Sequence, residues 1–322
     1  MAHSQCAWKA ALRSGLDRWC SEVGIHSVNG VEVQRLRQRC PLVILSGATP
    51  GPFYHSHPHV PAEFDHLQFD MSSQVRANIQ TIRKIGNSVA DTNLPFQFSG
   101  STDFCRSPQL LHWISNNGDG FAKNASTCAD VTMEACMEEG MDNASVLATI
   151  QTGDNVSDRR FLLETFAIFG MEGESDTQQS KGSTLQIDIK AEFDPKYFMP
   201  YVPAYVVTGP SDLALFSVTA ASGETTAPIS GSEQVEAVIG KLLQVLNGLG
   251  AAFEDVVLCW NRVSHLDEDE EAVLMTRSRM GLHKPLAESV LEVVESDSNG
   301  LALDGTPLQL EYIIVAQVPR PT

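Results

Sequence analysis

Residues 308–316 alternate between apolar and polar positions in a way that predicts a strand close to the C-terminus. One face of this strand carries Leu308, Leu310, Tyr312 and Ile314, and the other carries Gln309, Glu311, Ile313 and Val315. Glu311 is the single acid of the segment, and its neighbours are apolar. An ionised carboxylate in such a place is costly unless a donor, a cation or a ligand compensates it. Glu311 is therefore the first candidate functional residue.

Periodicity and turn residues predict further elements along the chain. Helices are expected at residues 6–24, 126–140, 157–170, 232–249 and 267–280. Strands are expected at residues 31–39, 42–46, 96–99, 146–151, 185–191, 205–207, 213–219, 256–263, 289–294 and 308–316. The first two strands are expected to form a hairpin. The pattern between residues 50 and 123 is poor, and it leaves the state of residues 71–92 open.

Several of these features recur about 110 residues later. Gly140 and Gly250 each follow an expected helix at an offset of 110, and Gly170 and Gly281 do so at an offset of 111. The order strand, strand, helix, strand, helix, strand therefore appears twice, which predicts a tandem duplication. We predict an α+β fold of two domains, each with a mixed sheet and two helices packed on one face. The domains would be residues 1–198, with an insertion at about 50–125, and residues 199–322.

Composition and charge agree with this picture and exclude some partners. The chain has 322 residues, 43% of them hydrophobic, which is enough for two domains with real cores. It has 22 Lys and Arg against 40 Asp and Glu, a net charge of -18, so a phosphate backbone would be repelled over most of the surface. We expect neither nucleic acid nor an anionic membrane as partner. A local cluster such as Arg277 and Arg279 could still attract a small anionic substrate.

Targeting and cofactor signals are missing from the sequence. No apolar run reaches 18 residues, and charges such as Lys9 and Arg13 interrupt the first twenty, so we expect a cytoplasmic protein. Seven scattered cysteines without a Cys-x-x-Cys pair argue against a disulfide framework and a zinc knuckle. Dinucleotide-binding, Walker and serine hydrolase motifs are not found, and no cofactor is expected.

A histidine-rich loop is the one weak metal signal. His55, His57 and His59 would face one side if the segment were extended. No carboxylate or cysteine stands at a set spacing from them. We therefore expect no metal site there.

Residues 203–317 carry a series of short motifs. In order, they are Pro203-Ala-Tyr205, Leu215-Phe-Ser217, Ser222-Gly223-Glu224, the helix 233–250 that ends in glycine, and Leu310-Glu311. This series resembles the YjgF/RidA family, also called the Rid or UK114 family, whose fold is chorismate-mutase-like. In the first half only Leu45-Ser46-Gly47 and the order of elements are similar. The resemblance implies a homotrimer with a cofactor-free site in a cleft between subunits.

Departures from the family pattern bear on the substrate. Deaminating members have an Arg just before the penultimate strand, where this chain has Glu288, so the clamp for a substrate carboxylate would be lost. The Ser-Gly pair after the second strand appears here as Ser217-Val218, which removes the close backbone approach that Gly permits. The standard deamination of 2-iminobutyrate-type substrates is therefore not implied. Tyr205 and Glu311 are retained, a phenol and a carboxylate able to position a water or exchange a proton.

The resemblance gives a set of candidate site residues, each with a simpler alternative. The catalytic candidates are Glu311 and Tyr205, and the substrate-binding candidates are Ser217, Arg277, Arg279 and Glu288. The alternatives are a solvent-facing or cross-strand acid for Glu311, a core aromatic for Tyr205 and a solvated strand end for Glu288. Arg277 and Arg279 would then serve only as partners of a helix dipole.

Chorismatases offer a second resemblance. They have a similar chain length, a YjgF-like C-terminal domain behind a divergent N-terminal one, and a Glu of the last strand that transfers a proton to an enol ether. Their Ser-Gly-Thr-Ala-Ser run resembles Ser217-Val-Thr-Ala-Ala221.

Three functions therefore stay open. The leading hypothesis is a cofactor-free acid/base enzyme acting on a small imine, enamine or enol-type metabolite. The alternatives are a chorismatase-like lyase or hydrolase that releases pyruvate from chorismate, and a non-catalytic regulator that binds a small ligand.

Overall fold

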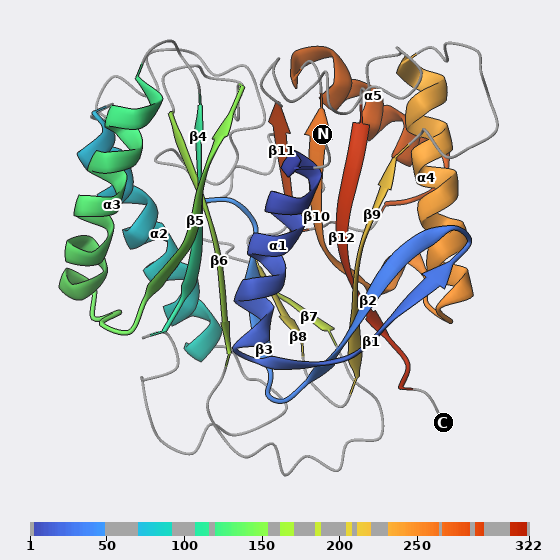
Figure 1. Ribbon diagram of the computed structural model, residues 1–322, viewed down its shortest axis with the longest axis horizontal. Helices are drawn as coiled ribbons and strands as arrows, with labels where there is room; N and C mark the ends of the chain where they lie inside the picture. The colour runs from blue at the N-terminus through green and yellow to red at the C-terminus, as the bar shows by residue number, and fades with distance from the viewer. Residues whose placement is uncertain are drawn as a thin grey trace.

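The computed structural model describes residues 3–48, 70–91, 107–115, 120–153, 162–170, 184–187, 204–207, 211–219, 231–263, 266–283, 287–292 and 310–320. This part of the chain forms two six-stranded mixed sheets and five α-helices. The α+β fold class is thereby confirmed. Figure 1 shows a pair of helices on the outer side of each sheet, with α1 running between the two halves.

Sheet A is built from strands of both halves of the sequence. Its strands are, in spatial order, β1 (Cys20–Val28), β2 (Val31–Gln38), β9 (Asp212–Thr219), β12 (Leu310–Val318), β10 (Val256–Val263) and β11 (Glu288–Glu292). Only β10 and β11 pair in parallel. Helices α4 (Gly231–Gly248) and α5 (Leu266–Arg279) cover one face and bury apolar side chains against it. The short 3-10 helix η5 (Phe253–Asp255) leads into β10.

Sheet B repeats this arrangement. Its strands are, in spatial order, β5 (Ser145–Thr152), β4 (Gln109–Ser115), β6 (Leu163–Gly170), β3 (Leu42–Leu45), β8 (Ala204–Val207) and β7 (Thr184–Ile187). Only β4 and β5 pair in parallel. Helices α2 (Met71–Asp91) and α3 (Phe121–Glu138) cover one face. Strand order and pairing directions therefore match between the two sheets.

Each sheet is completed by a hairpin that directly precedes, in sequence, a strand of the other sheet. The hairpin β1–β2 precedes β3 in sequence, yet β2 pairs with β9 of sheet A. The hairpin β7–β8 precedes β9, yet β8 pairs with β3 of sheet B. The boundary predicted at residues 198 and 199 falls between β7 and β8, inside one of these hairpins.

A third core lies between the sheets. Their inner faces pack on one another, and Trp113 of β4 meets Trp260 of β10 edge-on, with ring centroids 4.9 Å apart. Helix α1 (His3–Asp17) adds Trp8, Leu12 and Leu16, whose helical spacing predicts this buried stripe. The helix ends earlier than expected, because the chain enters β1 at Cys20.

The helix expected at residues 157–170 is wrong. Its second part is the strand β6, which lies between β4 and β3 with all eight residues buried. Phe166 and Phe169 mimic a helical stripe, but a strand buried on both faces also reads as a continuous apolar run, and periodicity does not separate the two. The state of residues 71–92, left open by the sequence, is helical at residues 71–91.

The first hairpin also differs from expectation. Residues 31–39 and 42–46 do give β2 and β3, but these strands belong to different sheets. The hairpin consists of β1 and β2, which Asn29 and Gly30 join with φ of 50° and 77°. A two-residue turn needs such left-handed conformations, and Asn-Gly is the pair that adopts them most readily.

The offset of 110 residues pairs the wrong helices. It aligns α3 with α4, whereas the sheet topologies match α2 with α4 and α3 with α5. The cause is that Gly140, Gly250 and Gly281 all end helices in the same left-handed conformation, so this signal does not tell one helix from another. Residues 71–91 and 109–115, which lie within the expected insertion, form α2 and β4. The expected strand 96–99 and the loop of His55, His57 and His59 lie outside the described residues.

Candidate functional site

Glu311 lies at the start of β12, directly opposite Arg262 of β10 in the antiparallel register. Opposite residues of such a pair point to the same side. Here that side is the inner face of sheet A, where Ile313 and Val315 belong to the core between the sheets. Arg262 Nη1 donates a hydrogen bond of 2.5 Å to Glu311 Oε2, and the two side chains are 0% and 1% exposed. The pair forms a buried ion pair between the two sheets.

Burial raises the pKa of Glu311, because desolvation disfavours the charged carboxylate. The charge and hydrogen bond of Arg262 lower this pKa, as does a hydrogen bond from Ser217 of β9, but burial outweighs them. Lys9 of α1 makes a further, smaller contribution in the lowering direction. A carboxyl group with a raised pKa is a candidate for proton exchange with a bound ligand.

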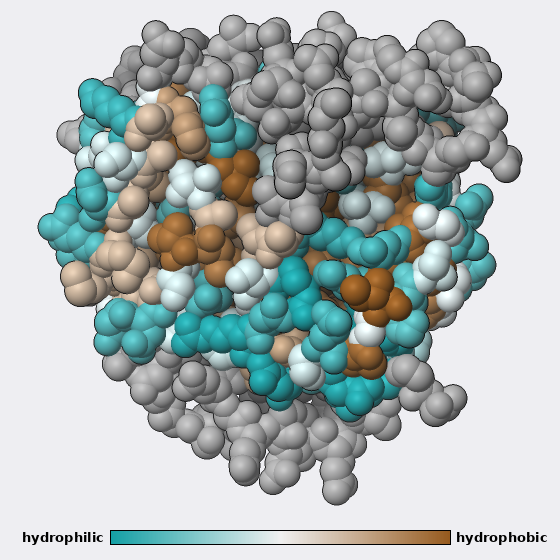
Figure 2. All heavy atoms as spheres, in the orientation of Figure 1, coloured by the Kyte–Doolittle hydropathy of each residue, from teal (hydrophilic) through white to brown (hydrophobic). Residues whose placement is uncertain are grey.

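Trp8 covers the ion pair and belongs to a cluster of three tryptophans. The indole of Trp8 covers the Arg262 guanidinium at 4.8 Å, a cation–π contact. Trp8 also stacks on Trp113 at 5.8 Å and meets Trp260 edge-on at 6.3 Å. Helix α1 thus brings Trp8 over a charge held by β10 and over a ring held by β4. In Figure 2 hydrophilic residues gather at the lower centre of this face, where α1 leads into the β1–β2 hairpin.

The Arg262 guanidinium has unused hydrogen-bonding capacity. Its Nε and Nη2 are buried and have no hydrogen-bond partner among the described residues. These two groups form one edge of the guanidinium, which binds a carboxylate through two parallel N–H bonds. A buried donor without a partner costs free energy. The edge is therefore suited to an anionic group of a small molecule.

Arg277 and Glu288 belong to a second cluster, on the helix-covered face of sheet A. Arg277 Nη1 of α5 donates to both carboxylate oxygens of Glu288 at 2.8 and 2.7 Å, and Asn261 Nδ2 donates to the same carboxylate. Burial opposes the charge of Arg277, but Glu288 outweighs it and the pKa of Arg277 is raised. The two residues neutralise one another, on the opposite side of the sheet from Glu311.

Tyr205 and Arg279 lie elsewhere. Tyr205 is on β8 of sheet B, where burial raises its pKa to about 12. Arg279 is exposed on α5 and forms an ion pair with Glu236 of α4. Of the six residues proposed from the sequence, the structure brings Glu311 and Ser217 together and places Arg277 with Glu288 in a separate cluster.

Sequence reasoning missed Arg262. The signal was present, because residues 256–263 predict a buried strand and Arg262 is the one charged residue within it. The argument applied to Glu311 applies equally to a cation on a buried strand. What the sequence does not contain is the register that sets Arg262 opposite Glu311.

A buried histidine lies on the helix-covered face of sheet B. His112 Nδ1 is 3.0 Å from Thr165 Oγ1, and its Nε2 is 3.3 Å from Thr132 Oγ1. Burial lowers the pKa of His112 to about 4, so the ring is neutral at pH 7. It acts as a hydrogen-bonding residue of the core.

The described ranges contain neither a metal-binding cluster nor a membrane-spanning helix. No group of three or more His, Cys, Asp or Glu side chains there is arranged to hold a metal ion. None of the helices described is long and apolar enough to cross a membrane.

Comparison with known proteins gives structural neighbours only. No family model and no curated protein matches the chain. One similar structure is a member of the YjgF/YER057c/UK114 family from Mycobacterium tuberculosis, at 20% identity and a TM-score of 0.25; the match covers 42% of this chain and all of that one. Another is a YjgF family member from Neisseria meningitidis, at 16% identity and a TM-score of 0.26; it covers 35% of this chain and 87% of that one.

Proposed function

We propose that this chain is a cofactor-free acid/base enzyme that acts on a small imine, enamine or enol-type metabolite at the inner face of sheet A. One observation carries the proposal: the buried Glu311, whose pKa is raised, is bonded to an arginine with a free binding edge. The carboxyl group supplies proton exchange. The Nε and Nη2 edge of Arg262 supplies binding for a carboxylate on the substrate.

The proposed chemistry for an imine is hydrolysis. Water adds to the carbon of the protonated imine as the Glu311 carboxylate takes one of the water protons, which gives a carbinolamine. The same carboxyl group then returns this proton to the amine nitrogen. The C–N bond breaks as the carbonyl forms, and the departing ammonia takes the hydroxyl proton and leaves as ammonium. Ser217 and Arg262 hold the carboxylate in place, since both bond to it. The pair is buried and covered by Trp8, and in such a medium of low polarity these charged interactions are stronger than in water. In this scheme Arg262 binds the substrate carboxylate. Deaminating members of the YjgF/RidA family use for this role an arginine at the position where this chain has Glu288.

The decisive experiment is Glu311→Gln, assayed by ammonia release from freshly generated 2-imino acids. We expect turnover to be lost, because the amide neither takes nor gives the proton. Glu236→Gln, which changes an exposed acid on α4, is the matched control and should retain activity. Circular dichroism reports whether the fold survives. Retained turnover in a folded Glu311→Gln protein contradicts the assignment.

Two assays separate the alternatives. Pyruvate release from chorismate by the wild-type protein, lost in Glu311→Gln, would favour the chorismatase-like reaction. A wild-type protein that is inactive in both assays but co-purifies with a small molecule would favour a binding protein.

The proposal includes a cytoplasmic homotrimer, which rests on the family resemblance alone. Sedimentation velocity tests the assembly. A monomer at micromolar concentration would contradict this part and leave the chemistry at Glu311 open to the same assays.

A further inference from the structure

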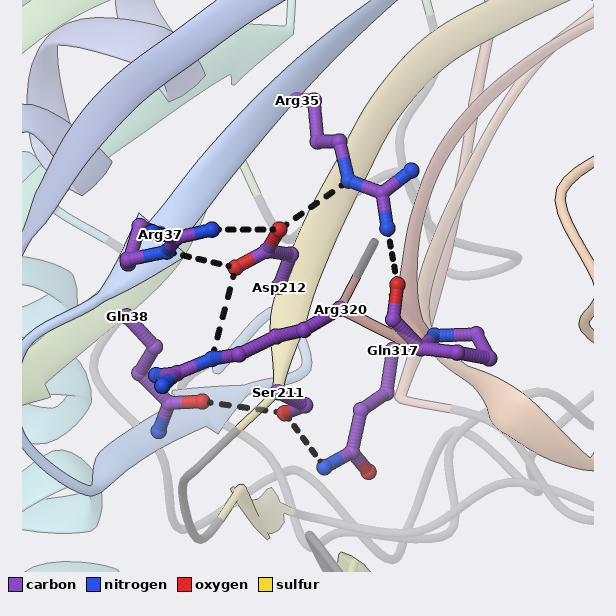
Figure 3. A network of polar contacts seen from close by, with 8 residues as sticks. Arg35, Arg37, Gln38, Ser211, Asp212, Gln317 and Arg320 are labelled. Carbon is purple, nitrogen blue, oxygen red and sulfur yellow. Dashed lines mark hydrogen bonds and ion pairs between the residues drawn. The ribbon is translucent and has the colours of Figure 1, made fainter. Parts of the chain in front are cut away.

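A third charged cluster lies at the other end of sheet A, where the hairpin β1–β2 meets the last residues of β12. Three arginines converge on Asp212, the first residue of β9, whose side chain is fully buried. Arg35 Nε and Arg37 Nε of β2 lie 3.0 and 3.1 Å from its carboxylate oxygens, and Arg320 Nε lies 3.7 Å away. Figure 3 shows the three side chains reaching Asp212 from different directions.

The charges of this cluster do not balance. Three guanidinium groups against one carboxylate leave a local charge of 3 − 1 = +2. The whole chain carries -18. A structural ion pair for the buried Asp212 needs one arginine, and the 14% exposed Arg35 meets that need, with its Nη2 fixed on the carbonyl oxygen of Pro319. Arg37 and Arg320 are additional cations held beside it.

These two arginines are accessible. Their side chains are 43% and 38% exposed. Arg37 donates to Asp212 through Nε and Nη2 and keeps Nη1 for a ligand, whereas Arg320 faces Asp212 through Nε and keeps both of its Nη groups. The Asp212 carboxylate holds these guanidinium groups in position, so their side chains lose less rotamer entropy when they bind a ligand. A row of polar side chains adjoins them, because Gln317 Nε2 donates to Ser211 Oγ at 2.6 Å and Ser211 Oγ donates to Gln38 Oε1 at 3.4 Å.

We propose that Arg37 and Arg320, organised by Asp212 and Arg35, form a binding site for a phosphate group. A phosphate dianion matches the local charge of +2, and guanidinium groups bind it through parallel N–H bonds. The site lies apart from the ion pair of Glu311, which is at the opposite end of β12. A phosphate group bound there is a second ligand or an anionic effector. It would connect the hairpin β1–β2 to β9 and to the C-terminal segment.

Inorganic phosphate tests the proposal, with the full chain and with sodium chloride at matched ionic strength as reference. We expect saturating phosphate to raise the Tm by about 2–4 °C relative to chloride. Arg37→Gln and Arg320→Gln should each weaken phosphate binding about tenfold in isothermal titration. Arg76→Gln on α2, an exposed arginine paired with Glu134 and Glu138, should bind like the wild type. An equal response to phosphate and chloride, or equal loss in all three variants, would overturn the proposal.

Asp212→Asn gives an independent test. This change leaves Arg35 and its neighbours without their carboxylate, so the protein should lose stability in chloride and recover more Tm with phosphate than the wild type does. The reason is that phosphate then supplies the missing negative charge. A folded Asp212→Asn protein that phosphate stabilises less than the wild type would contradict the proposed location.

The source of the phosphate group is decided by comparing inorganic phosphate with glycerol phosphate. Equal affinity supports a site for a phosphorylated metabolite, and tighter binding of inorganic phosphate supports a site for the free ion. Absence of binding by both overturns the proposal.

Discussion

At the scale of single residues, the charge of Glu311 is tolerated between the sheets because Arg262 faces it. Taking two charges out of water costs about as much as their attraction returns, so such a pair contributes little net stability. Each partner nevertheless depends on the other. If one is removed, the other is left buried and uncompensated, and the protein then either unfolds or neutralises the remaining group.

Arg262→Gln tests this dependence. We expect the free energy of unfolding at pH 7 to fall by about 3–5 kcal/mol, because Glu311 is left as an unpaired buried carboxylate. The measurement is urea denaturation. The double variant Arg262→Gln with Glu311→Gln should recover much of the loss, since it holds neither charge. If Arg262→Gln is as stable as the wild type, the pair is not buried as the structure has it.

His112 predicts a pH dependence of stability. Its pKa is about 4 in the folded protein, against an ordinary value of 6.5, so between these values the unfolded chain binds the extra proton. Stability therefore falls as the pH is lowered from 6.5 to 4, by about 3 kcal/mol from this residue. Urea denaturation across this range should show a shallower fall for His112→Gln than for the wild type. An equal pH profile of the variant and the wild type would mean that folding does not lower the pKa of the imidazole.

At the scale of elements, the β1–β2 hairpin depends on its two-residue turn. Gly30 has a φ of 77° and open space around the position of a Cβ atom, so only backbone conformation disfavours a side chain there. Gly240, in the middle of α4, also has open space but does not have a positive φ. The two glycines therefore separate the conformational effect from any steric one.

Alanine at the two positions should act in opposite directions. Gly30→Ala is expected to destabilise the protein by about 1–2 kcal/mol, because an L-residue is strained in the left-handed region. Gly240→Ala is expected to stabilise it by about 0.5–1 kcal/mol through helix propensity. Thermal denaturation of both variants measures the effect. Equal shifts of the same sign would show that the turn does not have the described conformation.

At the scale of the whole molecule, the exchanged hairpins tie the two halves of the sequence together. Strand β2 of the first half pairs with β9 of the second half, and this pairing brings Arg35 and Arg37 to Asp212. Strand β8 of the second half pairs with β3 of the first half. A cut at residue 198 therefore separates β1 and β2 from the rest of sheet A and β8 from the rest of sheet B, and it exposes backbone groups that are paired in the intact chain.

Separate expression of residues 1–198 and 199–322 tests how far the halves are independent. We expect each fragment alone to be unfolded or aggregated, because each lacks a strand of its sheet and the apolar core between the sheets is divided. Co-expression should restore a folded complex. Circular dichroism and gel filtration provide the measurement. Two fragments that fold and stay monomeric on their own would instead establish two independent domains with the predicted boundary.

The sequence by itself determined the features that depend on near neighbours along the chain. The helices at 126–140, 232–249 and 267–280 and the strands at 256–263 and 308–316 follow from periodicity and end signals, and the structure confirms them within a few residues at their ends. The burial of Glu311 follows from the same alternation. The Asn29-Gly30 pair also carried a hairpin signal that local reasoning could have used.

Only the tertiary structure decided which segments meet. Glu311 and Arg262 are 49 residues apart in sequence, and their contact depends on the register between β10 and β12. The same holds for β6, whose apolar run becomes a strand because β4 and β3 flank it. It also holds for the hairpins β1–β2 and β7–β8, each of which joins the sheet that the next strand in sequence does not belong to. Periodicity reports which face of an element is buried but carries no record of the partner that buries it. For this reason the sequence identified the acid, and the fold supplied the arginine beside it.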